Sequence, residues 1–181
     1  MMVGRFEKVS YQQFLEAMKG EFDLVKTGED FPSPDSPEFE QYVKKAYDAI
    51  QLPRRATPGS AGYDMRTPLP FTLPPFGGSI KIPTGIRVKI SDGWFLCCLP
   101  RSGMGFKYFA RLANTAGVID SDYYDSSNEG HIFIKLRNEG DKTIEANVGD
   151  AIVQGIFLEY GITFDDNATG ERDGGFGSTG K

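Results

Sequence analysis

The chain has 181 residues, which is a common size for a single globular domain. Hydrophobic residues make up 39% of it, enough to build a core, and its 22 glycines and 11 prolines indicate many turns between short elements. Twenty Lys and Arg against 25 Asp and Glu give a formal net charge of −5. Because proteins that coat nucleic acids need an excess of basic residues, we expect no nucleic-acid partner.

Cysteine and histidine usage narrows the possible chemistry further. The two cysteines, Cys97 and Cys98, are adjacent, so on a strand they would point to opposite faces, which favours free thiols in a reducing compartment. No apolar run is long enough to span a membrane or form a signal segment, and we expect a cytoplasmic protein without membrane contact. The single histidine, His131, excludes a two-histidine zinc site, so proton chemistry should fall to carboxylates.

The first fifty residues have helical patterns. Ser10-Tyr-Gln-Gln13 has the form of a capping box, and Phe14, Leu15 and Met18 follow at helical spacing, with Gly20 as the stop. Ser36-Pro37 then supplies an N-cap and a first-turn proline for a second helix. Its apolar face is Phe39, Tyr42, Val43, Ala46 and Ile50. We predict a short helical N-terminal extension over residues 1–50, too small for a core of its own.

From residue 51 the pattern changes to short apolar runs separated by turn residues, which predicts a mainly β core over residues 51–165. The expected strands are Tyr63–Met65, Phe71–Leu73, Ser79–Ile82, Ile86–Ile90, Trp94–Leu99, His131–Asn138, Thr143–Ala146 and Ala151–Tyr160. Many short strands at this rhythm are typical of a sandwich or a jelly roll.

Residues 166–181 form a glycine-rich arm that we expect to be mobile. Gly174, Gly175, Gly177, Ser178 and Gly180 offer backbone amides with little side chain in the way, which suits the wrapping of an anion. Arg172 and Lys181 add positive charge, and Phe176 adds a flat apolar ring. Together these residues suit a ligand with phosphates at one end and a ring at the other.

Four further segments gather polar residues at the ends of predicted strands. Gly59-Ser-Ala-Gly-Tyr-Asp64 combines small residues with a carboxylate, and Pro100-Arg101-Ser102-Gly103 can clamp an anion. Without a histidine nearby in sequence, Ser102 is interpreted as a hydrogen-bond donor and not as a nucleophile.

The other two segments supply a candidate base and an amide. Asp120 ends a short strand and could accept a proton from water, while Tyr123 offers a face for a sugar or a base. Gln154 lies in an apolar strand, where an unpartnered amide would be costly, so it should reach a protein or ligand partner.

In this order, the five segments resemble the five motifs of the homotrimeric deoxyuridine triphosphatases (dUTPases). The matching stretches are Ser60-Ala-Gly-Tyr-Asp64, Pro100-Arg-Ser-Gly103, Gly117-Val-Ile-Asp-Ser-Asp-Tyr123, Gly149-Asp150 with Gln154, and Gly174-Gly-Phe-Gly-Ser-Thr-Gly180. The resemblance implies a jelly-roll-like β fold and a homotrimer with three shared sites. It also implies hydrolysis of dUTP to dUMP and pyrophosphate with Mg²⁺.

The resemblance assigns a role to each matching residue. Asp120 would be the general base that activates water, and Tyr123 would pack on deoxyribose and leave no room for a 2′-hydroxyl. Uracil would be recognised near Asn114, Gly117 and Phe133, and the phosphates by Arg101, Ser102, Gly103 and Gln154. Asp64 would act near the metal through water. Arg172, Phe176, Gly177 and Ser178 would belong to an arm that closes over the nucleotide, with Phe176 stacked on uracil and the other three gripping the phosphates.

The chain departs from the family pattern at three places. The fourth motif has Ala151 where many relatives have an arginine, and Arg172 stands four residues before Phe176 where many members place their arginine five before. The stretch from Tyr124 to Glu129 is also longer than in compact members, and we expect an extended loop near the site.

Two alternative functions remain open from the sequence. A dCTP deaminase shares the fold, but it needs a glutamate that activates water at the base, and none stands in the five segments. A trimer that binds a protein partner through residues 1–50, with the nucleotide site as a switch, is the other possibility.

Overall fold

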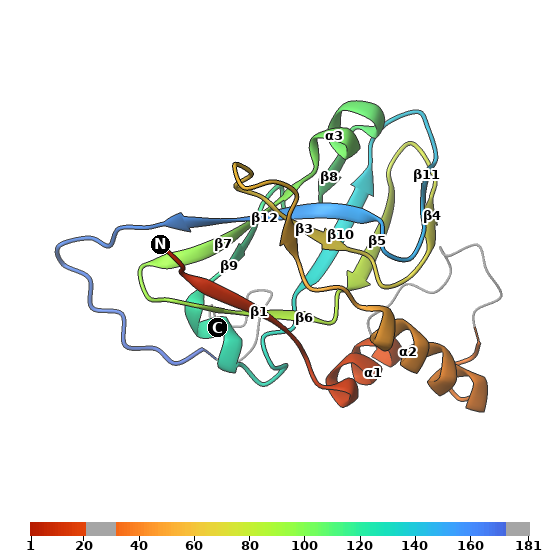
Figure 1. The fold of residues 1–181 in the computed structure, drawn as a ribbon, viewed down its shortest axis with the longest axis horizontal. Coiled ribbons are helices and arrows are strands. Elements are labelled where there is room, and N and C mark those ends of the chain that lie inside the picture. Colours follow the sequence, from red (N-terminus) through yellow and green to blue (C-terminus); the bar gives the residue numbers. More distant parts are fainter. Residues whose placement is uncertain (21–31, 173–181) are drawn as a thin grey trace.

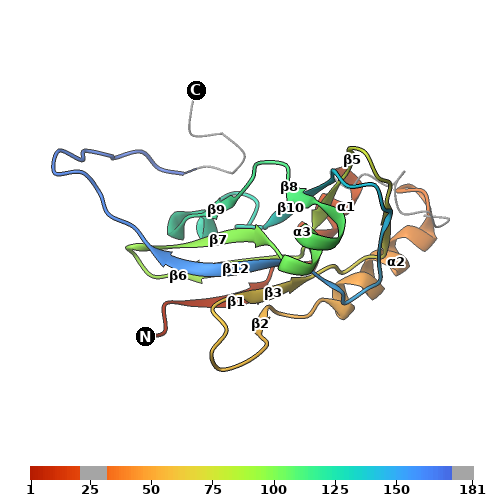
Figure 2. The same ribbon diagram turned by 90° about the horizontal axis from the view of Figure 1, so that it is seen from above.

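The computed structural model describes residues 1–20 and 32–172, and its elements are mostly strands (Figures 1 and 2). The strands are β1 (Gly4–Lys8), β2 (Arg54–Arg55), β3 (Tyr63–Arg66), β4 (Phe71–Leu73), β5 (Gly78–Pro83), β6 (Ile86–Ile90), β7 (Trp94–Pro100), β8 (Ala110–Leu112), β9 (Gly117–Ile119), β10 (Phe133–Asn138), β11 (Ile144–Ala146) and β12 (Ala151–Glu159). The helices are α1 (Tyr11–Gly20), α2 (Pro37–Ala49), α3 (Ser102–Tyr108) and the 3-10 helix η2 (Ser121–Asp125).

The strands pair into small antiparallel sheets. The largest has the order β2-β3-β12-β7-β9, a second has the order β5-β10-β8, and β1-β6 and β11-β4 form two-stranded sheets. Neighbours in these sheets are far apart in the sequence, as in β3-β12 and β5-β10, so the chain crosses between layers repeatedly. The mainly β, jelly-roll-like fold expected from the sequence is confirmed. None of the described helices is long and apolar enough to cross a bilayer.

One hydrophobic core joins the sheets to the N-terminal helices. Along β10 the buried side chains Ile134 and Leu136 alternate with the exposed Lys135 and Arg137, which is the burial pattern of a strand with one face on the core. The helices contribute fully buried side chains to the same cluster, among them Phe14 and Phe39. The N-terminal segment is therefore packed into the fold and does not lie loosely on its surface.

Both N-terminal helices begin where the sequence predicts. The Ser10 hydroxyl accepts a 3.1 Å hydrogen bond from the Gln13 amide at the start of α1, and α2 begins at Pro37 after the N-cap Ser36. Strand β1 was not predicted. It precedes the helices and pairs antiparallel with β6, with Gly4 opposite Ile90 and Lys8 opposite Ile86. The described part of the first fifty residues, 1–20 and 32–50, is thus β1 followed by α1 and α2.

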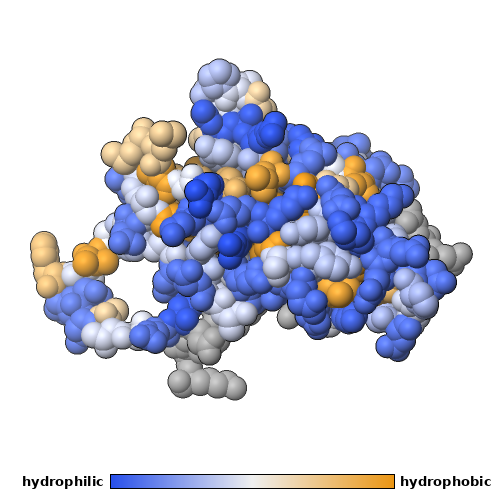
Figure 3. Space-filling model, turned by 60° about the horizontal axis from the view of Figure 1, so that its bottom comes forward, coloured by the Kyte–Doolittle hydropathy of each residue, from blue (hydrophilic) through white to orange (hydrophobic). Residues whose placement is uncertain are grey.

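The C-terminal segment leaves the body of the molecule after β12. Residues 158–171 are all exposed, and Figure 1 shows this stretch running out from the end of β12 and looping back toward η2. In Figure 3 it stands away from the body of the molecule at the left. Phe164 and Ile162 are among its exposed apolar side chains. Few contacts within the chain therefore hold this segment.

Candidate functional site

Strands β3, β12 and β7 bring three of the predicted site residues to neighbouring positions. The antiparallel register places Gln154 of β12 between Asp64 of β3 and Leu99 of β7. Arg101 follows β7 directly, and its Nε lies 3.0 Å from Oδ1 of Asp64, whose side chain is only 17% exposed. After the role that the sequence resemblance implies, we call Asp64, Arg101, Ser102, Gly103 and Gln154 the phosphate-site residues.

Gln154 has the partner that its place in an apolar strand requires. Its Nε2 donates a 3.3 Å hydrogen bond to the carbonyl oxygen of Pro100. A Cβ on Gly62 would lie 2.5 Å from Oε1 of Gln154, so a larger residue there would push the amide aside. The small residues of the first motif therefore serve to let the backbone pass close to this side chain.

Arg101 also connects the second and fourth motifs. Its Nη1 donates to the carbonyl oxygen of Ala151 at 3.4 Å, in addition to the ion pair with Asp64. Ala151 occupies the position where many relatives carry an arginine, and in this chain Arg101 supplies the positive charge beside Asp64. The pair leaves Arg101 42% exposed, so the guanidinium still has open faces for an anion.

Ser102 and Gly103 begin α3, an element that the sequence did not predict. Two glycines lie within its seven residues, which is a poor local preference for helix. Both Ser102 and Gly103 are exposed, and Figure 1 shows α3 at the edge of the molecule beyond the end of β7. The serine hydroxyl and the guanidinium of Arg101 are thus adjacent in the chain and open to solvent.

A second group of predicted residues lies around β9, η2 and the start of β10. Asp120 is the N-cap residue of η2, and its side chain is 42% exposed. Tyr123 of the same 3-10 helix is buried, and its hydroxyl donates a 2.9 Å hydrogen bond to the carbonyl oxygen of His131. Burial raises the pKa of this phenol above its usual range, so it is a neutral donor.

The remaining nucleoside-binding candidates surround this segment. Asn114 lies in an exposed turn next to Thr115, which has a positive φ of 70°. This turn begins beside β10, because the Ala113 amide donates a 2.9 Å hydrogen bond to the Lys135 carbonyl oxygen, and it then reverses the chain so that Thr115 faces Leu112. Gly117 pairs with Cys98, where an added Cβ would lie 3.2 Å from the cysteine Cβ. We call Asn114, Gly117, Asp120, Tyr123 and Phe133 the nucleoside group.

Arg172 lies against the nucleoside group in this chain. Its guanidinium pairs with Asp120 through Nη2 and with Asp122 through Nε at 2.7 Å, and it lies 5.9 Å above the Tyr123 ring. The sequence resemblance implied a phosphate contact for Arg172, and here its partners are the carboxylates. Phe176, Gly177 and Ser178 lie outside the described residues.

Sequence reasoning did not single out the residues that hold Tyr123 in place. Asn128 donates from Nδ2 to the Tyr123 hydroxyl at 2.8 Å, and Ser126 donates to the Tyr123 carbonyl oxygen at 2.7 Å. Both residues belong to the stretch that is longer than in compact family members. Their types, Ser and Asn before a glycine, indicate a turn, but nothing in the pattern identifies the tyrosine as their partner.

Asp120 and Arg101 lie at opposite ends of β7. Gly117 pairs with Cys98 and Ile119 pairs with Leu96, so Asp120 lies toward the Trp94 end of β7, whereas Arg101 follows its other end. Six residues of strand separate them, which corresponds to roughly 20 Å. Among the described residues, no hydrogen bond or ion pair joins Asp120 or Tyr123 to Arg101, Ser102 or Gln154. One chain therefore carries two half-sites.

The described residues contain no cluster of three or more His, Cys, Asp or Glu side chains that could hold a metal ion by themselves. The acidic member of the phosphate-site residues is Asp64, which is already paired with Arg101 through one oxygen. Mg²⁺ prefers oxygen ligands, keeps several waters and commonly binds through substrate phosphates. The residues present thus fit a magnesium ion carried by a nucleotide, with Asp64 able to contact it through water.

His131 has a structural role. It is fully buried, and its Nε2 accepts a 2.8 Å hydrogen bond from the Gly85 amide, which places the proton of the neutral ring on Nδ1. Burial, with a smaller contribution from Lys81, lowers the pKa of His131 to about 3. A buried neutral ring with Nε2 bonded to the Gly85 amide serves to hold the backbone at this point of the core.

Comparison with known proteins identifies the family. Residues 48–180 match the dUTPase family, a range that contains all five motifs. The deoxyuridine 5′-triphosphate nucleotidohydrolase of Lactococcus lactis is 39% identical over 146 residues, which cover 78% of this chain and 96% of that protein. The corresponding protein of Ralstonia nicotianae is 43% identical over 140 residues, 72% of this chain and 90% of that protein.

Solved structures agree with the sequence relatives. The crystal structure of dUTPase from Streptococcus mutans superimposes with a TM-score of 0.56 at 33% identity, over 64% of this chain and 90% of that one. The dUTPase from phage phi11 of S. aureus shares the fold with a TM-score of 0.55 at 21% identity, over 71% of this chain and 94% of that one. The match over residues 48–180 and the identity to nearly the whole Lactococcus protein show that this chain belongs to the dUTPase family.

Proposed function

We propose that the protein hydrolyses dUTP to dUMP and pyrophosphate. The observation that carries this proposal is that one family match contains every predicted site residue, including the Asp120 carboxylate at the N-cap of η2 and Arg101 directly after β7. Hydrolysis at a phosphoryl group requires an aligned water, a base and neutralisation of charge more than it requires a covalent intermediate. The two half-sites supply these parts without a histidine or a cysteine.

In this mechanism Asp120 takes a proton from the attacking water. Its carboxylate is open to solvent on one side and held on the other by Arg172, so it can face a water while keeping its orientation. Tyr123 forms the floor beneath the sugar, because its ring is fixed at the hydroxyl by His131 and Asn128. A fixed ring at this position would exclude a ribose 2′-hydroxyl by contact.

The phosphate-site residues would bind the triphosphate. Arg101 can turn its free donors to the phosphates, Ser102 and the Gly103 amide can donate to phosphoryl oxygens, and Gln154 lies beside them. When bound, magnesium would neutralise charge on the triphosphate, with Asp64 as its contact through water. Phe176, Gly177 and Ser178 would close over the nucleotide, and Arg172 would join them at the phosphates only by giving up its pairs with Asp120 and Asp122.

A homotrimer would bring the two half-sites together. Asp120 and Arg101 are roughly 20 Å apart along β7, which is too far for both to act on one phosphoryl group. The phosphate-site residues of one subunit must therefore meet the nucleoside group of another. Exposed apolar side chains are available for such contacts. They include Phe106 and Phe109 near α3, Val118 on β9, and Ile162 and Phe164 beyond β12.

Replacement of the proposed base tests the mechanism. Asp120→Asn should lower kcat by a factor of about 10²–10⁴, because the amide cannot accept the proton, while dUTP still binds. Asp125→Asn is a matched control, since that carboxylate is exposed and has no hydrogen bond or ion pair among the described residues. Turnover of the Asp120 variant within tenfold of the wild-type rate would remove Asp120 from this role.

A substrate panel tests the reaction itself. Pyrophosphate release is measured with dUTP, UTP, dTTP and dCTP, and ammonia release is measured with dCTP. We expect pyrophosphate from dUTP far faster than from the other three. Ammonia from dCTP would instead identify a deaminase, and equal rates on dUTP and UTP would contradict the role proposed for Tyr123.

A further inference from the structure

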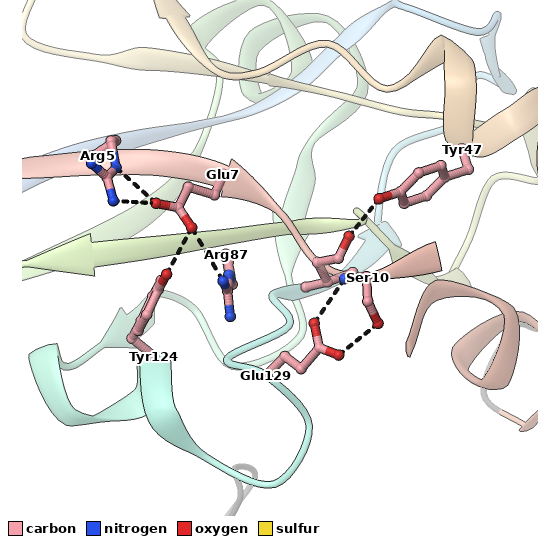
Figure 4. Close-up of polar contacts among 8 residues, drawn as sticks. Arg5, Glu7, Ser10, Tyr47, Arg87, Tyr124 and Glu129 are labelled. Carbon is pink, nitrogen blue, oxygen red and sulfur yellow. Dashed lines mark hydrogen bonds and ion pairs between the residues drawn. The ribbon is translucent and has the colours of Figure 1, made fainter. Parts of the chain in front are cut away.

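The loop that follows Tyr123 is attached to the N-terminal segment. Residues 124–130, here called the 124–130 loop, connect Tyr123 to His131, and the backbone of Glu129 has a positive φ of 57°. That conformation is uncommon for a residue other than glycine, so contacts elsewhere must hold it. Figure 4 shows the two polar attachments, which lie on either side of the junction between β1 and α1.

The first attachment joins Glu129 to the start of α1. The Ser10 amide donates to Oε2 of Glu129 at 2.7 Å, and the Ser10 hydroxyl donates to Oε1 at 2.6 Å. In a capping box the side chain three residues into the helix accepts from the N-cap amide. Here Gln13 has that position, and the carboxylate of Glu129 takes over the role from a distant loop. Its negative charge also suits a helix N-terminus.

The second attachment joins Tyr124 to β1. The Tyr124 hydroxyl donates to Oε2 of Glu7 at 2.7 Å, and Arg87 donates to the same oxygen at 3.2 Å. The Arg87 guanidinium also lies 4.2 Å from the centre of the Tyr124 ring. The hydrogen bond from Tyr124 is the main cause that lowers the pKa of Glu7, so this carboxylate stays ionised. The contact therefore persists at neutral pH.

A third, apolar contact joins α1 to the nucleoside group through the buried ring of His131. Phe14 of α1 packs at 6.3 Å from the His131 ring, and that ring lies 4.3 Å from the Phe133 ring. The His131 carbonyl oxygen is the acceptor of the Tyr123 hydroxyl. The N-terminal segment thus touches both ends of the stretch that carries the sugar-binding tyrosine. Residues 1–47 lie outside the matched family range, so this support is an addition to the family fold.

We propose that Glu129 and Tyr124 are positioning residues for the nucleoside pocket, and that residues 1–20 serve as their anchor. By holding the 124–130 loop against Ser10 and Glu7, they fix the Tyr123 ring and sharpen the selection of deoxyribose over ribose. The proposal rests on the proposed dUTP hydrolysis and adds to it the determinant of sugar selectivity. Glu129 and Tyr124 act through Tyr123 and need no contact with the nucleotide.

The test compares three replacements at one position. Glu129→Gly removes the carboxylate and suits the positive φ, so it should not destabilise the loop through backbone strain. We expect the ratio of kcat/KM for dUTP to that for UTP to fall by about fivefold, and amide hydrogen exchange in residues 124–130 to rise by about tenfold. Glu129→Gln keeps one acceptor for Ser10 and should restore most of both values. Glu129→Ala should resemble Glu129→Gly.

Two further variants make the test specific. Asp125→Ala removes an exposed carboxylate from the same stretch and should change neither value. Ser10→Ala removes the hydroxyl donor but keeps the backbone amide donor, so it should lower the selectivity ratio by less than Glu129→Gly does. The double variant should lower the ratio no further than Glu129→Gly alone, because that replacement already removes both contacts. Additive losses in the double variant would contradict an action through Ser10.

The outcomes separate this proposal from the proposed function. Faster exchange in the loop with an unchanged selectivity ratio would overturn the positioning role, and unchanged exchange in Glu129→Gly would overturn the anchor itself. If the wild-type protein hydrolyses no dUTP, the proposed function fails. The ratio of the dissociation constants of dUTP and UTP, measured by calorimetry, would then replace the kinetic ratio in the same comparison.

Discussion

At the scale of single residues, His131 is a polar side chain whose contacts all lie within the folded core. Its Nε2 is occupied by the Gly85 amide, its ring packs on Phe133, and its carbonyl oxygen holds Tyr123. Nδ1 has no hydrogen-bond partner among the described residues. A second proton would create a charge in the core without an acceptor, which explains why the ring is kept neutral.

Protonation of His131 predicts a pH dependence of stability. The pKa is lowered from 6.5 to about 3 in the folded chain, so between these values the unfolded state binds a proton that the folded state does not. The contribution is fully present above pH 6.5 and is lost as pH falls, by at most about 1.4 kcal/mol per pH unit. The free energy of unfolding in urea should therefore fall from pH 7 to pH 5 more steeply in the wild type than in His131→Gln, whose Oε1 can still accept from Gly85. Equal slopes would show that His131 does not titrate on unfolding.

At the scale of elements, α2 is a structural part of the core. Phe39 and Val43 are fully buried against it, whereas Lys45 is exposed on the other side of the helix. Phe39→Ala should lower the free energy of unfolding by about 3–5 kcal/mol, as expected for an aromatic side chain lost from a packed interior. Lys45→Ala should change it by less than about 0.5 kcal/mol. A loss in the Phe39 variant no larger than in the control, measured by urea denaturation, would show that α2 is dispensable.

The elements that the sequence predicted are those with a clear local pattern. The runs Ile86–Ile90 and Trp94–Leu99 alternate or are fully apolar and lie between turn residues, and both are strands. Strand β1 has the sequence GRFEK, with one apolar residue, and exists because it pairs with β6. Helix α3 contains two glycines, so its local preference opposes the structure that its surroundings impose. Pairing and packing of this kind are not encoded in a local pattern.

The same distinction applies to the site. Arg101 and Asp120 directly follow β7 and β9, as their place in the sequence pattern predicts, whereas Asp64 and Gln154 lie within β3 and β12 as neighbours in the register. Glu129 was seen only as part of a long loop, because its partner Ser10 is 119 residues away in the chain. The local capping pattern had Gln13 in the position that Glu129 fills from a distance. Side chains that position others through long-range contacts are therefore the part of a site that a single sequence conceals.

At the scale of the whole molecule, the proposed homotrimer would make activity a property of the assembly, because Asp120 and Arg101 lie at opposite ends of β7. In that homotrimer, a subunit with a defective nucleoside group would still present intact phosphate-site residues to its neighbour, and the converse would hold for a subunit with defective phosphate-site residues. In a closed ring of three identical interfaces, each site would use one group from each of two adjacent subunits. Two inactive variants can then complement each other.

This arrangement predicts recovery of activity on mixing. Asp120→Asn and Arg101→Ala homotrimers should each be nearly inactive, and equal amounts unfolded and refolded together should recover about a quarter of the wild-type rate. Three quarters of randomly assembled trimers contain both variants, and each has one intact site out of three. Mixing without unfolding, so that subunits do not exchange, is the control and should recover nothing. If both residues instead served one site within a single chain, every site would carry a defect, and the refolded mixture would stay as inactive as its components.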